Sequence, residues 1–112
     1  HEMMGGRLSC RIDGSAVPVL PGAWQAADDC LYTAAGQCNR NHTGPFVRFE
    51  NVPFAMQEIL FDPQTSGGLL LAVAPEEAEN LRDELQKASL PAQIVGEITE
   101  KQDTEIFVSY PE

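Results

Sequence analysis

The chain has 112 residues, 43% of them hydrophobic and 21% charged, and its 17 acidic and 7 basic side chains give a net charge of −10. This composition is that of one globular domain over residues 1–112, and it excludes a disordered or coiled-coil protein. The negative charge excludes nucleic-acid binding and argues against binding to an anionic membrane, since both need a Lys/Arg surface. No apolar run reaches the ~18 residues that a membrane-spanning helix needs.

The first half of the chain alternates short regular elements with turns. Residues 8–12 alternate in polarity and predict a strand. Apolar residues at helical spacing predict a helix over 22–34, and the Gly- and Asn-rich stretch 36–45 predicts a loop. A short strand is expected at 46–49, and a proline favours the start of a short helix over 53–61.

The second half predicts a β-α-β unit over residues 69–98. Residues 69–74 form a continuous apolar run, which is typical of a strand covered on both faces. Pro75 and the acids after it favour a helix start, and this helix is expected to end near Ser89. A strand around residues 92–98 completes the unit, whose two strands are expected to be parallel.

The chain ends in one more alternating segment. Ile106, Val108 and Tyr110 predict a last strand that pairs back as an antiparallel hairpin. The fold class expected from these elements is α+β. A mixed β-sheet has helices packed on it and contains the β-α-β unit and the C-terminal hairpin strand.

The three cysteines indicate a compartment rather than a site. Cys10, Cys30 and Cys38 are widely spaced and include no C-x-x-C pair, so neither a zinc site nor a thioredoxin-type site is expected. Free thiols without a disulfide framework are typical of the reducing cytoplasm. We therefore expect three free thiols in a cytoplasmic protein.

The most specific stretch of the chain is DPQTSGGLL, from Asp62 to Leu70. It resembles the signature near the carboxyl end of the selenophosphate synthetases (selenide, water dikinases), which belong to the ATP-dependent superfamily of aminoimidazole ribonucleotide synthetase. Shorter matches occur in the same order over nearly the whole chain, at residues 1–3, 20–22, 36–41 and 96–98. One of them departs from the family's Gly-Gly-Thr-x-Arg-Asn run, because Ala35 and Gln37 replace two of its members.

The resemblance implies that the chain is a C-terminal domain, about the last third of a longer enzyme. Such a parent makes selenophosphate from selenide and ATP with Mg²⁺, and it releases AMP and phosphate. The family's N-terminal ATP-binding domain supplies the reactive Cys or selenocysteine, a nearby Lys and most metal-binding aspartates, and it builds the homodimer. No catalytic residue, metal ligand or bound cofactor is therefore expected in these 112 residues, and the isolated chain is expected to be inactive.

Two groups of residues are candidates for the nucleotide or phosphate cleft of the parent. In the first, Thr65, Ser66, Gly67 and Gly68 offer hydroxyls and backbone amides to an oxyanion. The alternative is a tight turn whose glycines adopt positive φ, and the predicted order of helix, turn and strand favours it, because phosphate loops usually open a helix. The second group is Arg40 and Asn41. These side chains could reach the nucleotide or the missing domain, and the alternative is that they make structural hydrogen bonds within this chain.

Two alternatives to this function stay open. In the first, the chain is the C-terminal domain of another aminoimidazole ribonucleotide synthetase-like ATP-dependent enzyme. In the second, it is a noncatalytic α+β domain that binds or regulates a partner. The DPQTSGG run favours a selenophosphate synthetase over other members of the superfamily. The coding sequence upstream of His1 would distinguish all three.

Overall fold

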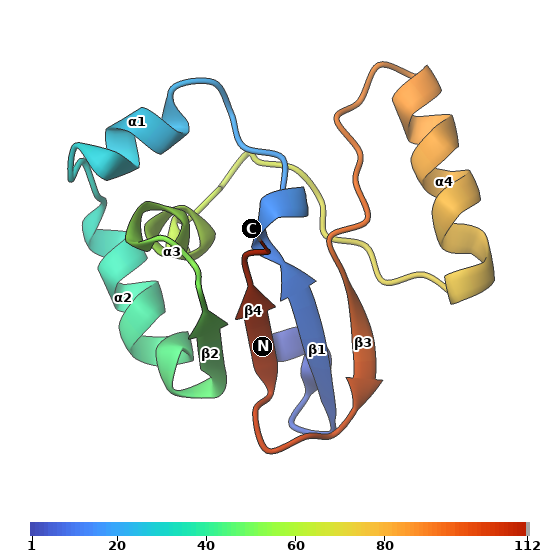
Figure 1. The fold of residues 1–112 in the computed structure, drawn as a ribbon, viewed down its shortest axis with the longest axis horizontal. Coiled ribbons are helices and arrows are strands. Elements are labelled where there is room, and N and C mark those ends of the chain that lie inside the picture. The colour runs from blue at the N-terminus through green and yellow to red at the C-terminus, as the bar shows by residue number, and fades with distance from the viewer. Residues whose placement is uncertain (112) are drawn as a thin grey trace.

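A computed structural model describes residues 1–111 and contains a four-stranded mixed sheet (Figure 1). The strand order is β2-β4-β1-β3, and the strands are β1 (Leu8–Asp13), β2 (Val47–Glu50), β3 (Gly96–Glu100) and β4 (Ile106–Ser109). Strand β4 is parallel to both of its neighbours, β1 and β2, whereas β3 is antiparallel to β1. The α+β class with a mixed sheet is confirmed.

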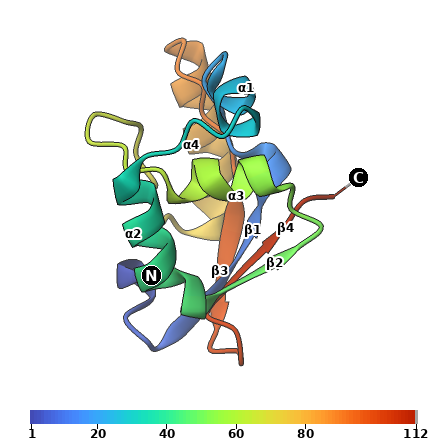
Figure 2. The same cartoon turned by 90° about the vertical axis from the view of Figure 1, so that its left-hand side faces the viewer.

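Four α-helices accompany the sheet: α1 (Ala23–Asp28), α2 (Ala34–Thr43), α3 (Phe54–Phe61) and α4 (Pro75–Lys87). The first three gather beside β2, where α3 packs against both α1 and α2, and α4 lies on the opposite side, beside β3 (Figures 1 and 2). Within residues 1–111, no helix combines the length and the apolar character that crossing a bilayer would require.

The core lies between α3 and one face of the sheet. Met56 of α3 is fully buried and clusters with Val52 and with Ile106 and Val108 of β4. The register places Cys10 of β1 beside Ile106. Because side chains alternate along a strand, every second residue of β1, β2 and β4 points to this face, and these residues are apolar: Cys10, Ile12, Val47, Phe49, Ile106 and Val108. The amphipathic pattern that predicted β1 therefore reflects real burial.

The two predictions for residues 22–45 are wrong in extent and type. A helix was expected to continue to residue 34, but α1 ends at Asp28 and Cys30 has a left-handed φ of 61°, which a continuing helix excludes. The expected loop 36–45 is mostly helix α2. The Thr33 side chain caps this helix by accepting a hydrogen bond from the backbone N–H of Gly36 at 2.9 Å.

The β-α-β unit predicted over residues 69–98 is absent from the described structure. Residues 69–74 form no strand, and the next strand is β3, which begins at Gly96 and runs antiparallel to β1. Helix α4 forms as predicted, with Pro75 in its first turn, but it contains no buried residue. The apolar run is thus not covered on either face by residues 1–111.

The predicted C-terminal hairpin is also wrong. Strands β3 and β4 are neighbours in sequence, but β1 lies between them in the sheet, and each pairs with β1 instead of with the other. The connection over residues 101–105 therefore crosses the end of β1. Its backbone is tied there, because the Gln102 N–H donates to the buried Ser9 Oγ at 2.8 Å.

Candidate functional site

The DPQTSGG loop begins at the end of α3 and is anchored to α2. Asp62 follows the last residue of α3, and its Oδ1 accepts a hydrogen bond from Thr33 Oγ1 at 3.1 Å. Asn39 of α2 donates from Nδ2 to the carbonyl of Phe61 at 2.8 Å. Gly36 leaves room for the Thr33 cap, since a Cβ there would lie 3.1 Å from Thr33 Oγ1. Asp62 thus holds two helix ends together.

The central hydroxyls of the loop face solvent. Thr65 and Ser66 are exposed, and neither side chain makes a hydrogen bond with any other residue in the 1–111 range. The backbone turns here through a hydrogen bond from the Gly67 N–H to the Gln64 carbonyl at 3.2 Å. These two hydroxyls are therefore free to bind a ligand or another part of a longer protein.

The two glycines of the loop do not play the part predicted for them. Neither Gly67 nor Gly68 has a positive φ, so the expectation of a left-handed turn is wrong. Gly67 is needed for a different reason. A Cβ at this position would lie 2.7 Å from both Cβ and Oε1 of Gln64, whereas a Cβ on Gly68 would meet nothing within 4 Å. The turn depends on close packing at one glycine only.

Arg40 is engaged within the protein. Its guanidinium forms an ion pair with Glu58 and donates to Gln57 Oε1 at 3.3 Å, so that it joins α2 to α3. The guanidinium carbon also lies 5.1 Å from the ring centroid of Phe54 and 4.8 Å from that of Phe61. These distances are those of cation–π contacts. The side chain is a clamp between two helices.

Asn41 lies next to this clamp but is exposed, and its Oδ1 accepts from Gln37 Nε2 at 3.0 Å on the same helix. No hydrogen bond among residues 1–111 joins Arg40 or Asn41 to Thr65 or Ser66. The structure therefore links α2 to the start of the loop through Asp62 and the Phe61 carbonyl. It does not link the two groups of candidate residues to each other.

A hollow of about 280 Å³ lies where the loop leaves the core. Asp62, Asn39, Thr43 and His1 line it with polar groups, and most of its remaining wall is apolar, including Ile106. Apolar walls with a few polar groups are the usual lining of a small-molecule site. Asp62, which lines this hollow, is also the first residue of the DPQTSGG motif.

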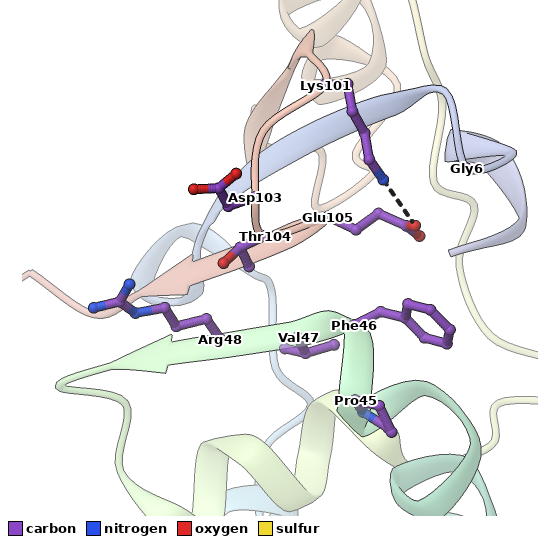
Figure 3. A pocket seen from close by; sticks show the side chains of 9 residues that line it. All are labelled: Gly6, Pro45, Phe46, Val47, Arg48, Lys101, Asp103, Thr104 and Glu105. Atoms are coloured by element: carbon purple, nitrogen blue, oxygen red, sulfur yellow. Dashed lines mark ion pairs between the residues drawn. The ribbon is translucent and has the colours of Figure 1, made fainter.

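A second hollow, of about 330 Å³, lies where the β3–β4 connection meets the start of β2 (Figure 3). Glu105 is 5% exposed there, and its Oε1 lies 2.6 Å from His1 Nδ1 while its Oε2 lies 3.6 Å from Lys101 Nζ. Figure 3 shows Lys101 reaching toward Glu105 and Arg48 pointing away from that pair. The His1 ring stacks on Phe46 at 4.2 Å. The buried carboxylate is thus satisfied by its own neighbours.

The sequence prediction missed both buried acids, Glu58 and Glu105. A signal existed for Glu58, because it is the single charged residue in the apolar helix FAMQEILF and so required a partner. Nothing distinguished Glu105 from the other charged residues before β4. In the part of the chain that the structure covers, no three His, Cys, Asp or Glu side chains are grouped so that they could hold a metal ion.

Comparison with known proteins defines the class of this chain. The sequence model for the C-terminal domain of AIR synthase related proteins matches residues 1–109, and the chain belongs to this family. Its curated relatives include proteins called selenide, water dikinase. The one from Agathobacter rectalis is 48% identical over 109 residues, which are 96% of this chain and 32% of the relative.

Two further relatives of the same name show the same partial coverage. The protein of Desulfitobacterium hafniense strain DCB-2 is 40% identical over 108 residues, and that of Treponema denticola is 38% identical over 116 residues. These alignments include 96% and 97% of this chain, but only 32% of each relative. The chain therefore spans about a third of the length of the proteins it matches.

Proposed function

We propose that this chain is the C-terminal domain of a selenide, water dikinase. In this proposal the parent enzyme forms selenophosphate from selenide and ATP and releases AMP and phosphate. The observation that carries it is the match over 96% of the chain, at 48% identity, to a protein of that name. The DPQTSGGLL run from Asp62 to Leu70, which resembles the signature of this family, points the same way.

The proposal assigns the chemistry to the rest of the parent. ATP and Mg²⁺ bind mainly in an N-terminal domain, which also carries the reactive Cys or selenocysteine and forms the homodimer in the cytoplasm. The 112-residue chain covers the nucleotide cleft and has no activity or cofactor of its own. This division agrees with the share of the relatives' length, 32%, that the chain accounts for.

Within the cleft, we assign contact with the nucleotide phosphates to Thr65, Ser66 and the backbone of Gly67 and Gly68. Their support is the exposure of both hydroxyls and their lack of partners among residues 1–111. Asn41 is the exposed candidate on α2. Arg40 acts differently in this proposal, since Glu58 already neutralises its charge, and it positions the helix that carries Asn41.

The test is selenide-dependent ATP consumption by the full-length gene product. Phosphorus NMR should show selenophosphate, AMP and phosphate formed from ATP, with no AMP when selenide is omitted. The purified 112-residue chain should form none of the three products. A full-length protein that consumes ATP without selenide, or that never yields selenophosphate, would show that the parent is a different enzyme.

Variants of the full-length protein test the loop. Thr65→Ala and Ser66→Ala should each lower kcat/KM by about 10-fold or more, because each loses a hydrogen bond to a charged group. Thr99→Ala on β3 is the matched control, since its hydroxyl donates to the neighbouring Glu100 carbonyl. Unchanged turnover in both loop variants would remove these residues from the nucleotide site.

A further inference from the structure

The most unusual surface of the molecule is the segment that follows the DPQTSGG loop. Leu69 is 86% exposed, Leu70 64%, Leu71 53% and Val73 43%. Four large apolar side chains in five consecutive positions thus face solvent. Scattered exposed leucines are ordinary in soluble proteins, but a contiguous apolar patch marks a surface that another group covers.

The backbone of the same segment is also unpaired. Among residues 1–111, no backbone hydrogen bond involves the N–H or C=O groups of residues 68–73. The residues are neither helical nor part of the sheet. A segment with free backbone groups and apolar side chains is suited to pairing with a further strand.

The side-chain pattern shows what kind of partner is needed. In an extended chain Leu69, Leu71 and Val73 point to one face, and the residues between them, beginning with Leu70, point to the other. Both faces are apolar, which is typical of a strand inside a sheet that is covered on both sides. A single groove or a one-sided contact would leave half of these side chains in water.

The described part of the chain does not supply that cover. Strand β3 pairs only with β1, and α4, which follows the segment, contains no buried residue. Figure 1 shows the segment leading to α4 beside the sheet, with α4 standing clear of it. The missing cover must therefore come from outside residues 1–111.

We propose that residues 69–74 are the docking strand for the portion of the parent polypeptide that precedes His1. The occupant is an apolar β-strand from that portion, accompanied by elements that cover the two faces. This inference rests on the proposed function, because it requires the longer chain. The relatives place about two-thirds of their length outside the region that this chain matches, and the family is defined as a C-terminal domain, so that length lies upstream.

A second copy of the chain fits the segment less well. Self-pairing of residues 69–74 would join two six-residue strands along one edge and would leave both apolar faces largely uncovered. An isolated two-stranded ribbon is marginal in water. The upstream portion has enough chain to supply both a strand and the layers on its two sides.

Hydrogen exchange in the full-length protein tests the pairing. The amides of residues 69–74 should exchange at least about 100-fold more slowly than those of the exposed Gln64–Gly67 turn, because strand pairing removes them from water. The amides of β1 give the reference for a paired strand. Exchange of residues 69–74 as fast as that of the turn would overturn the proposal.

Photo-crosslinking identifies the occupant with a probe that closely resembles leucine. Full-length protein in which leucine is replaced by photo-leucine carries the probe at Leu69, Leu70 and Leu71. Illumination followed by mass spectrometry should link these residues to a peptide upstream of His1 in the same polypeptide. Links only within residues 1–112 would overturn the proposal, and so would links between two copies of the segment in mixed isotope-labelled samples.

A charged substitution tests the apolar character of the contact. In the full-length protein, Leu70→Asp should lower Tm by about 5 °C or more and abolish the slow exchange of residues 69–74. The matched control is Leu20→Asp, at a leucine that is 79% exposed and lies before α1. Equal Tm values for the two variants would contradict a buried role for Leu70.

These measurements separate the two proposals. A full-length protein that makes no selenophosphate but protects residues 69–74 refutes the proposed enzyme and leaves the docking strand standing. An active enzyme in which the segment exchanges rapidly refutes the docking strand alone.

Discussion

The ion pair between Arg40 and Glu58 allows a quantitative test of what joins α2 to α3. The Glu58 side chain is 8% exposed and that of Arg40 is 23% exposed. Replacing Arg40 by Met keeps much of the side-chain volume but leaves a buried carboxylate without its cation. Removing one partner of a buried pair costs about 3–5 kcal/mol, and loss of the contacts with two phenylalanine rings adds about 0.5–1 kcal/mol for each.

The reverse change should cost less. Glu58→Gln keeps an oxygen that accepts from Arg40, and the unpaired charge that remains belongs to the more exposed partner. We expect about 1–3 kcal/mol for this variant. The double variant R40M/E58Q should be more stable than the sum of the single effects predicts, with a coupling energy of about 1–3 kcal/mol.

Urea unfolding of the four proteins, followed by circular dichroism, measures this cycle. Arg82→Met is the matched control, because Arg82 pairs with Asp83 at the surface of α4, where the side chains are 31% and 54% exposed. It should change the free energy of unfolding by at most about 1 kcal/mol. The reasoning is refuted if Arg40→Met is no more costly than Arg82→Met, or if the coupling energy is zero.

Two further predictions concern the loop and the thiols. Gly67→Ala should lower the free energy of unfolding by about 0.5–2 kcal/mol, because the new Cβ has no room beside Gln64. For Gly68→Ala, the free energy of unfolding should stay within about 0.5 kcal/mol of wild type, because a Cβ there meets nothing. Thermal melting of the two variants distinguishes these effects. Burial raises the pKa of the Cys10 thiol, so less reactive thiolate is present at a given pH. Timed alkylation at pH 8 should therefore modify Cys10 about 10-fold more slowly than the two exposed cysteines, and equal rates would contradict this.

The sequence best predicted the elements whose residue pattern lies entirely within the element itself. Strand β1 follows from alternating polarity, and α4 follows from Pro75, the acids after it and the spacing of its apolar residues. Helix α2 was missed because its glycine and asparagines indicate a loop by composition. In the structure, a local cap and a tertiary contact override that preference, since the Thr33 side chain caps the helix at Gly36 and Asn39 donates to the Phe61 carbonyl at the end of α3.

The errors of topology have a different origin. A short connection between β3 and β4 favours a hairpin, but no local pattern shows that β1 will lie between them. The run at residues 69–74 was predicted to be a strand covered on both faces because all six residues are apolar, but among residues 1–111 it has no strand beside it and its side chains are exposed. The candidate site divides in the same way, because Thr65 and Ser66 were found from a motif, whereas the ion pair between Glu58 and Arg40 depends on how α2 and α3 pack together.

The position of β4 has a consequence for synthesis of the protein. This strand lies between β2 and β1 and is the last of the four to leave the ribosome. Until it emerges, β2 has no partner in the sheet, and Val47 and Phe49 have no strand beside them. The nascent chain therefore exposes apolar surface until β4 has been synthesised, and in this state it is prone to aggregate and to bind chaperones. A message truncated before the codon for Ile106 would leave the product in that state permanently.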